Sequence, residues 1–187
     1  MNAEAAPSLP PGRRPGDARP DIGAMIRVDQ AGEYGATRIY QGQLAVLGAR
    51  HPAARLISRM QAQEERHLER FDDMMVARGV RPTLLQPFWH VAGHALGAAT
   101  ALIGPNAAMA CTAAVETEID RHYSAQRRAL GSSEPDFGAT IAEFQAEEIE
   151  HRDTAIAAGA EDALGYPILS GLIRAGCRLA IALSKRI

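Results

Sequence analysis

The sequence contains little cysteine, few aromatic residues and no large excess of charge of either sign. Cys111 and Cys177 are its two cysteines, and no CxxC pair is present. A disulfide framework and a cysteine-ligated zinc site are therefore excluded, and we expect two reduced, buried thiols in an intracellular protein. The formal net charge is −2 over 187 residues, which argues against a nucleic-acid-binding protein because such proteins carry a basic face.

β-strand patterns and targeting signals are also absent from the sequence. No run of alternating apolar and polar residues stands between turn signals, so neither a sheet nor a strand-dependent dinucleotide-binding fold is expected. Residues 1–21 are rich in Pro, Gly and Ala and contain no apolar segment of a signal peptide. We expect a disordered arm over residues 1–21 and a single domain over residues 22–187.

Apolar residues recur with the 3.6-residue period of an α-helix through the rest of the chain. Asp21 and Pro52 are typical of helix starts, and Gly79, Gly131 and Gly159 are typical of helix ends. The predicted helices cover roughly residues 22–49, 52–78, 84–103, 106–130, 135–158 and 162–185. The predicted fold class is all-α.

Glutamates occupy the apolar face of four predicted helices, where an unpaired charge is costly. In "QEERHLERFDD" (63–73), helical phase aligns Glu64 and His67 with Met60 and Phe71, whereas Glu65 lies on a polar face. In "EEIEHRD" (147–153), the second glutamate faces inward and Glu147 falls on a polar face. The residues that this argument turns toward the core are Glu33, Glu64, His67, Glu116, Glu148 and His151.

These six residues form a repeated order of Glu followed by Glu-x-x-His. The spacing is 31 residues in the first half (64 − 33) and 32 in the second (148 − 116). Buried carboxylates become favourable when cations pair them, and oxygen-rich ligation with one imidazole per ion suits iron or manganese. The sequence predicts a dinuclear metal site in a ferritin-like four-helix bundle core with two additional apolar or amphipathic helices. Spacing alone leaves manganese catalase and iron storage open as alternatives.

Several segments resemble the demethoxyubiquinone hydroxylase family of ubiquinone biosynthesis. They are "RVDQAGEYGATRIYQGQLAVLG" (27–48), "AMACTAAVETEIDRHY" (108–123), "EEIEHRD" (147–153) and "AGCRLAIALSKRI" (175–187). The resemblance implies a di-iron monooxygenase that uses O2 to hydroxylate the ring of a polyprenyl demethoxyubiquinol. It implies that the same six residues are the metal ligands of the family. Gln30 is a departure, because many relatives are expected to have histidine there.

The resemblance also implies cofactors, partners and a location. We expect two iron ions per chain, an external reductant that is either NADH or a separate reductase, a polyprenyl quinone substrate and partner proteins of ubiquinone biosynthesis. The sixth predicted helix carries Leu172 and Leu179 among Arg178 and Lys185, which suits a helix that lies on a membrane surface. We therefore expect a peripheral protein on the cytoplasmic face of a bacterial inner membrane, or on the matrix side of the mitochondrial inner membrane.

Other polar residues have both a structural and a functional interpretation. His122 and Tyr123 follow Glu116 by six and seven residues. They are either packing residues or, as the resemblance implies, catalytic residues that position substrate or deliver electrons and protons. Tyr40 is interpreted as a core residue. His90 and His94 lack a third ligand and are interpreted as packing or interfacial histidines. The resemblance further suggests that Arg178 contacts the substrate or a reductant. The alternative function is a ferritin-like iron oxidation and storage protein.

Overall fold

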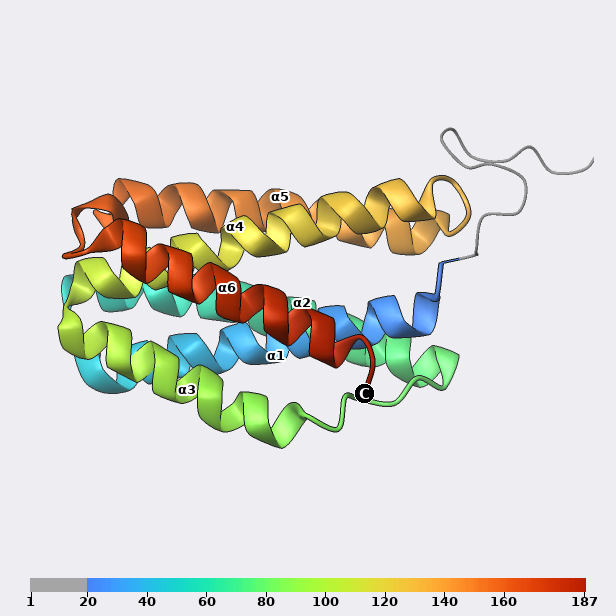
Figure 1. Ribbon diagram of the computed structural model, residues 1–187, viewed down its shortest axis with the longest axis horizontal. Helices are drawn as coiled ribbons and strands as arrows, with labels where there is room; N and C mark the ends of the chain where they lie inside the picture. The colour runs from blue at the N-terminus through green and yellow to red at the C-terminus, as the bar shows by residue number, and fades with distance from the viewer. Residues whose placement is uncertain (1–19) are drawn as a thin grey trace, which may run out of the picture.

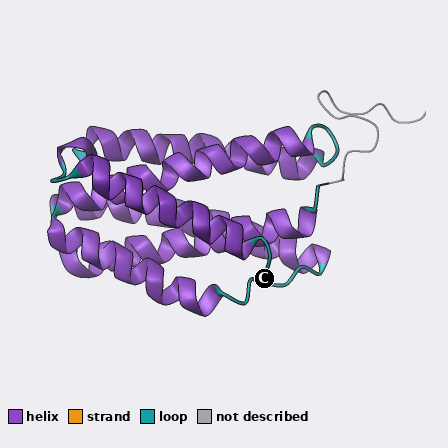
Figure 2. Cartoon of the chain, viewed as in Figure 1, coloured by secondary structure: helices purple, strands orange, loops and turns teal. Residues whose placement is uncertain are grey.

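The structure is a computed structural model that describes residues 20–187, so most of the expected arm lies outside the described residues (Figure 1). Six helices follow one another along the chain. They are α1 (Ile22–Leu47), α2 (Pro52–Arg78), α3 (Gln86–Ile103), α4 (Pro105–Leu130), α5 (Pro135–Ala157) and α6 (Tyr166–Ser184), with a short 3-10 helix η1 (Ala160–Asp162) before the last. Residues 20–187 contain no strand (Figure 2). The all-α prediction is confirmed.

The predicted helix ends are close to the observed ones because local signals set them. The side chain of Asp21 accepts a hydrogen bond of 2.9 Å from the backbone nitrogen of Ala24 and caps α1. Gly79 ends α2 in the left-handed region, at φ 62°. The sixth helix was predicted to start at about residue 162 but starts at Tyr166. The intervening residues form η1, and Gly165 has φ 68°, which a continuous α-helix does not tolerate.

Two helix pairs build the central bundle. Helix α1 packs on α2, and α4 packs on α5, while α3 packs along α1 and α6 along α4. Figure 1 shows α6 running diagonally in front of the middle of the bundle and α3 running beside α1. This arrangement matches the predicted ferritin-like bundle with two additional helices.

Two apolar clusters fill the bundle at different levels. One contains Tyr40 and Met60, and the other contains Phe71, Phe137 and Phe144. On each of the four long helices, the inward glutamate lies in sequence between the residues of one cluster and those of the other. The carboxylates therefore form a polar layer between two apolar layers, where water has little access.

Glycines bring α1 and α3 into backbone contact. A Cβ atom added to Gly97 would lie 1.9 Å from the carbonyl oxygen of Ile39, and one added to Gly42 would lie 2.1 Å from that of His94. Small residues that allow such an approach are frequent between membrane helices. The contact fixes α3 against the helix that carries Glu33.

Large apolar side chains are exposed on the outer faces of α3 and α6. Phe88 and Val91 on α3 and Ile168, Leu172 and Leu179 on α6 are each at least 60% exposed. Within the described residues, α6 alone is long and apolar enough to cross a membrane, a criterion that many soluble core helices also meet. Only 17% of the apolar α6 window is buried, so the described chain leaves most of this helix uncovered.

Candidate metal centre

The four long helices bring the six predicted ligands together. Glu33 comes from α1, Glu64 and His67 from α2, Glu116 from α4, and Glu148 and His151 from α5. Each of the six is at most 3% exposed. We refer to these residues as the six-ligand cluster. Helical phase alone selected all of them, and each one faces the bundle interior as predicted.

The six-ligand cluster divides into two groups that share two glutamates. One group contains Glu33, Glu64, His67 and Glu148, and the other contains Glu64, Glu116, Glu148 and His151. In each group the four ligand atoms lie within 4.8 Å of one another. Glu64 and Glu148 belong to both groups, so they have the position of bridging carboxylates. Glu33 and Glu116 each belong to one group and have the position of terminal ligands.

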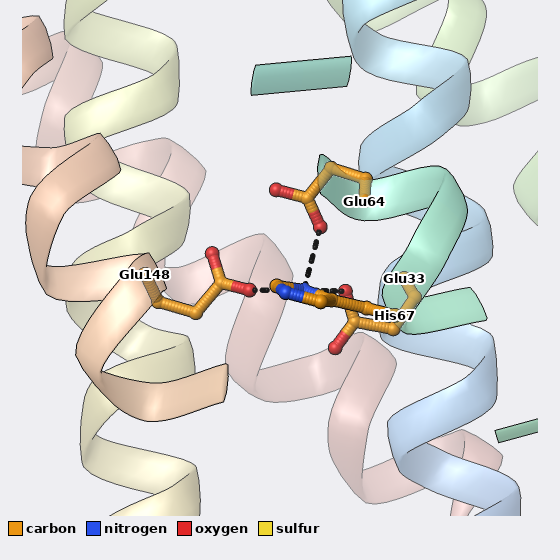
Figure 3. Close-up of side chains that lie close together, drawn as sticks. All are labelled: Glu33, Glu64, His67 and Glu148. Carbon is orange, nitrogen blue, oxygen red and sulfur yellow. Dashed lines mark ion pairs between the residues drawn. The ribbon is translucent and has the colours of Figure 1, made fainter. Parts of the chain in front are cut away.

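The imidazole Nδ1 atoms point at the shared carboxylates. His67 Nδ1 lies 3.1 Å from Glu148 Oε1, 3.5 Å from Glu33 Oε2 and 3.8 Å from Glu64 Oε2. Figure 3 shows these three carboxylates around the His67 ring. His151 Nδ1 lies 3.0 Å from Glu64 Oε1 and 3.2 Å from Glu148 Oε2. Each half of the cluster thus has one imidazole nitrogen directed at its centre.

The cluster fits a pair of divalent cations. His67 Nδ1, His151 Nδ1, Glu64 Oε1 and both oxygens of Glu148 are buried and make no hydrogen bond, although they approach one another to about 3 Å. Such atoms point at a common centre rather than along donor–acceptor lines. Four carboxylates would balance the charge of two divalent ions, and the oxygen-rich donor set suits iron or manganese.

The electrostatics of the cluster favour a positive charge at its centre. Burial raises the pKa of Glu64 well above its usual range, and the carboxylates of Glu148 and Glu33 raise it further. Burial lowers the pKa of His67, but Glu148 and Glu33 outweigh burial and raise it to about 10. Burial raises the pKa of Glu148, and the two histidines outweigh it and lower the pKa to about 2. Carboxylates thus surround each imidazole and attract cations.

The outer nitrogen of each imidazole donates to a residue that precedes a cluster glutamate. His67 Nε2 donates to Glu147 Oε2 at 2.9 Å, and His151 Nε2 donates to Gln63 Oε1 at 2.9 Å. A proton on Nε2 leaves the Nδ1 lone pair free to bind a metal. Gln63 Nε2 also donates to Glu147 Oε2 at 3.2 Å and joins the two pairs. Sequence reasoning missed Gln63 and assigned Glu147 to a polar face without a role.

Two tyrosines hold the terminal glutamates from the opposite helix. Tyr40 of α1 donates to Glu116 Oε1 at 3.1 Å, and Tyr123 of α4 donates to Glu33 Oε1. Tyr40 lies seven residues after Glu33, the partner of Tyr123, and Tyr123 lies seven residues after Glu116, the partner of Tyr40. Burial raises the pKa of both phenols well above the usual value. The nearby carboxylate, Glu116 for Tyr40 and Glu33 for Tyr123, raises the pKa further. The interpretation of Tyr40 as a core residue is correct but incomplete, because it also fixes a cluster carboxylate.

His122 lies outside the cluster in a separate polar network. Its Nε2 atom lies 3.0 Å from Asp29 Oδ1, which also accepts a hydrogen bond of 2.7 Å from Gln126 Nε2. Asp29 is buried, one helical turn before Glu33, and burial raises its pKa despite the opposing effect of His122. Gln30 donates to Asp72 Oδ1 at 3.0 Å and ties α1 to α2. Sequence reasoning missed Asp29 and Gln126, whose isolated positions give no signal.

The remaining polar residues from the sequence analysis take part in contacts between helices. Arg178 and Arg174 donate to Glu118 Oε1 at 2.9 Å and 2.7 Å and fasten α6 to α4. His90 Nδ1 is 2.8 Å from the Tyr34 hydroxyl on α1. Neither His90 nor His94 belongs to a potential metal-binding group among the described residues.

An apolar cavity of about 440 Å³ lies against the helices that carry the terminal glutamates. Gly32 and Gly35 of α1 and Val115 of α4 form one wall, and α3 and α6 form the opposite walls. Gly32 and Val115 are the direct neighbours of Glu33 and Glu116 in the sequence. The cavity has the size and apolar lining of a small-molecule site.

The chain is similar in sequence to several known proteins. Residues 20–184 match the family model described as "Ubiquinone biosynthesis protein COQ7". The 3-demethoxyubiquinol 3-hydroxylase of Rhodospirillum rubrum is 55% identical over 177 residues, which are 94% of this chain and 84% of the relative. The mitochondrial NADPH-dependent 3-demethoxyubiquinone 3-hydroxylase of Homo sapiens is 48% identical, over 91% of this chain and 80% of the relative. The mitochondrial 5-demethoxyubiquinone hydroxylase of Saccharomyces cerevisiae is 42% identical, over 87% and 77%.

Proposed function

The chain belongs to the COQ7 family of ubiquinone biosynthesis proteins, and from this premise we propose that it hydroxylates a polyprenyl demethoxyubiquinol with two iron ions held by the six-ligand cluster. It is an oxidoreductase, and the reaction adds a hydroxyl group to the quinol ring. The observation that carries the proposal is the sharing of Glu64 and Glu148 between two groups of four buried ligands. Bridging carboxylates of this kind hold two ions close together.

The bound iron pair would supply the activation of O2, and the chain supplies ligation, orientation and a dry site. Glu147 and Gln63 orient the two imidazoles, while Tyr123 and Tyr40 hold the terminal carboxylates of Glu33 and Glu116. The two apolar clusters exclude water from both ends of the carboxylate layer. These contacts fix the donor atoms before the reaction starts, so little reorganisation is needed.

The apolar cavity is the site proposed for the quinol and the first part of its prenyl tail. Its wall contains Gly32 and Gly35, and a Cβ atom at Gly35 would meet no atom within 4 Å. The space beside α1 therefore allows a flat ring to approach the helix that bears Glu33. His122 and Tyr123 remain the proposed catalytic residues. Tyr123 acts at the Glu33 carboxylate, and His122 acts through the buried Asp29 network.

The reductant is proposed to be an external nicotinamide dinucleotide. The names of the human and bovine relatives specify NADPH, which favours NADPH over the NADH considered from the sequence. A ferritin-like storage function is not supported, because relatives at 42–55% identity are named hydroxylases. Partner proteins of ubiquinone biosynthesis remain part of the proposal.

Complementation tests the substrate directly. In a strain without its own hydroxylase, which should accumulate demethoxyubiquinone, this chain should restore ubiquinone. The Glu116→Ala variant should not restore it, because one of the two groups loses its terminal carboxylate. Glu150→Ala, at an exposed position of α5, should restore ubiquinone like the wild type. Chromatography of the extracted quinones is the measurement. Persistent demethoxyubiquinone in cells with soluble, iron-loaded wild-type protein would refute the proposed substrate.

We also propose peripheral attachment to the inner membrane through the outer faces of α3 and α6. Their exposed apolar side chains are accompanied by Lys185 and Arg186 at the end of α6, a combination that suits an anionic membrane surface. A polyprenyl quinone resides in the bilayer, so attachment would bring the cavity to its substrate.

Flotation with liposomes that contain anionic lipid tests the attachment. The double variant Ile168→Glu and Leu179→Glu should float at least about tenfold less than the wild type, because it loses apolar contact at two positions of α6. Val76→Glu is the matched control, because Val76 is 84% exposed but lies on α2. Equal flotation of the double variant and the control would exclude α6 from the membrane-binding face.

A further inference from the structure

Helices α3 and α6 both line the apolar cavity but hardly interact with each other. Helix α3 packs on α1 and α6 packs on α4. Within residues 20–187, a single hydrogen bond joins α3 to α6: Trp89 Nε1 donates to Ser184 Oγ at 2.9 Å. Both Trp89 and Ser184 line the cavity. The only polar contact between these two walls therefore lies at the cavity itself.

The second half of α6 has few other attachments. The buried residues of α6 are Ile173 and Ser184, and none of the residues between them is fully buried. Glu118 of α4 holds Arg174 and Arg178, which leaves about two helical turns beyond Arg178 without an ion pair. Ala180 and Ile181 in these turns line the cavity. Ser184 is therefore the point at which the end of α6 is fastened to α3.

The size of the cavity requires an opening for a long ligand. A cavity of about 150 Å³ accommodates one benzene molecule, so 440 Å³ accommodates roughly three six-carbon groups. These correspond to a quinone ring and about two isoprene units. The rest of a longer tail must extend out of the cavity. Phe88 of α3 and Leu179 of α6 are each 60% exposed, so a tail outside the cavity would meet apolar side chains on the outer faces of both helices.

We propose that the Trp89–Ser184 hydrogen bond is a latch that holds α3 and α6 together beside the cavity, and that a long prenyl tail opens it in order to pass between the two helices. This inference rests on the proposed function, because that function supplies the prenylated ligand. One neutral, partly exposed hydrogen bond contributes a modest net free energy, so it closes the gap without preventing thermal opening. An indole beside an apolar face is also typical of residues at a membrane interface.

The latch makes a prediction that depends on tail length. A ligand that holds the gap open must break the hydrogen bond, whereas a ring without a tail leaves it intact. The Ser184→Ala variant lacks the hydrogen bond, so the tailed ligand does not have to break it. This variant should bind the tailed ligand about 2- to 12-fold more tightly, which is the range for one net hydrogen bond. Its affinity for the tail-less ring should be unchanged.

The chain contains its own reporter for this measurement, because Trp89 is the only tryptophan in the sequence. Quenching of its fluorescence by quinones gives the dissociation constant for the iron-loaded protein in detergent. The two probes are a ubiquinone with a long isoprenoid tail and the same quinone ring with a methyl group in place of the tail. Ser170→Ala is the matched control on α6, since Ser170 makes no side-chain hydrogen bond in the described structure.

Tighter binding of the tailed quinone alone by Ser184→Ala supports the latch. An equal change for both quinones, no change, or weaker binding of the tailed one would overturn it. Trp89→Phe provides a second measurement, because it removes the donor and keeps an aromatic ring. Its hydroxylation rate at low substrate should rise for long-tailed relative to short-tailed quinols, and a constant ratio would contradict the latch. If the wild type binds neither quinone, the proposed function fails. If the wild type binds the quinones and Ser184→Ala leaves the affinities unaltered, only the latch fails.

Discussion

Replacing Glu64 with alanine should remove bound iron and lower hydroxylation by more than about 100-fold. Glu64 belongs to both ligand groups and is fully buried, so its loss deprives each ion of a carboxylate. Changes to residues that only support metal ligands already cost about 10- to 100-fold, and loss of a shared ligand should cost more. Iron analysis and turnover of the purified protein are the measurements.

Glu65→Ala is the matched control, because the adjacent side chain is exposed and belongs to neither ligand group. It should keep two irons and full activity. A chelator should lower the melting temperature of the wild type, because bound metal stabilises the folded state, and should leave that of Glu64→Ala unchanged. Without metal, Glu64→Ala should be no less stable than the wild type, since it removes a buried carboxylate. A Glu64→Ala protein with two irons and normal turnover would refute the ligand assignment.

Replacing Gly97 with alanine should destabilise the fold by about 1–3 kcal/mol, the usual range for overpacking. The new Cβ atom would lie 1.9 Å from the carbonyl oxygen of Ile39, and a backbone atom cannot move away as a flexible side chain does. Helices α1 and α3 would have to separate. The higher helix propensity of alanine offsets part of this cost. Chemical denaturation of metal-free protein measures the effect without a contribution from bound iron.

Gly138→Ala should change the free energy of unfolding in the opposite direction. Gly138 lies within α5, and a Cβ atom there would meet nothing within 4 Å. The substitution should therefore stabilise the protein by about 0.5–1 kcal/mol through helix propensity alone. If Gly97→Ala were as stable as Gly138→Ala, the backbone contact between α1 and α3 would not exist in solution.

The sequence by itself determined the helices and the identity of the inward residues. Helix ends depend on local chemistry, such as the Asp21 cap and the left-handed Gly79, and these signals are visible without a fold. The inward position of Glu64 follows from a 3.6-residue period, because the residues three and four positions away share its face. The arrangement of ligands followed from applying this phase argument to four helices.

Some sequence interpretations were incomplete because they concern the direction of a side chain and not its partner. Glu147 was assigned to the polar face, and its carboxylate nevertheless reaches His67 on α2. Helical phase gives the direction of a side chain from its own axis but does not identify the helix that lies opposite.

The tertiary structure alone decided which residues meet across helices. Tyr40 pairs with Glu116 and Tyr123 with Glu33 because α1 and α4 lie face to face in the bundle. Gly97 meets the backbone of Ile39, and Trp89 meets Ser184 across 95 residues of sequence. Such contacts depend on the relative placement of whole helices, which the packing of all the apolar faces sets together. Periodicity within one segment contains no information about that placement, so the cavity and its α3–α6 hydrogen bond could not be predicted from the sequence.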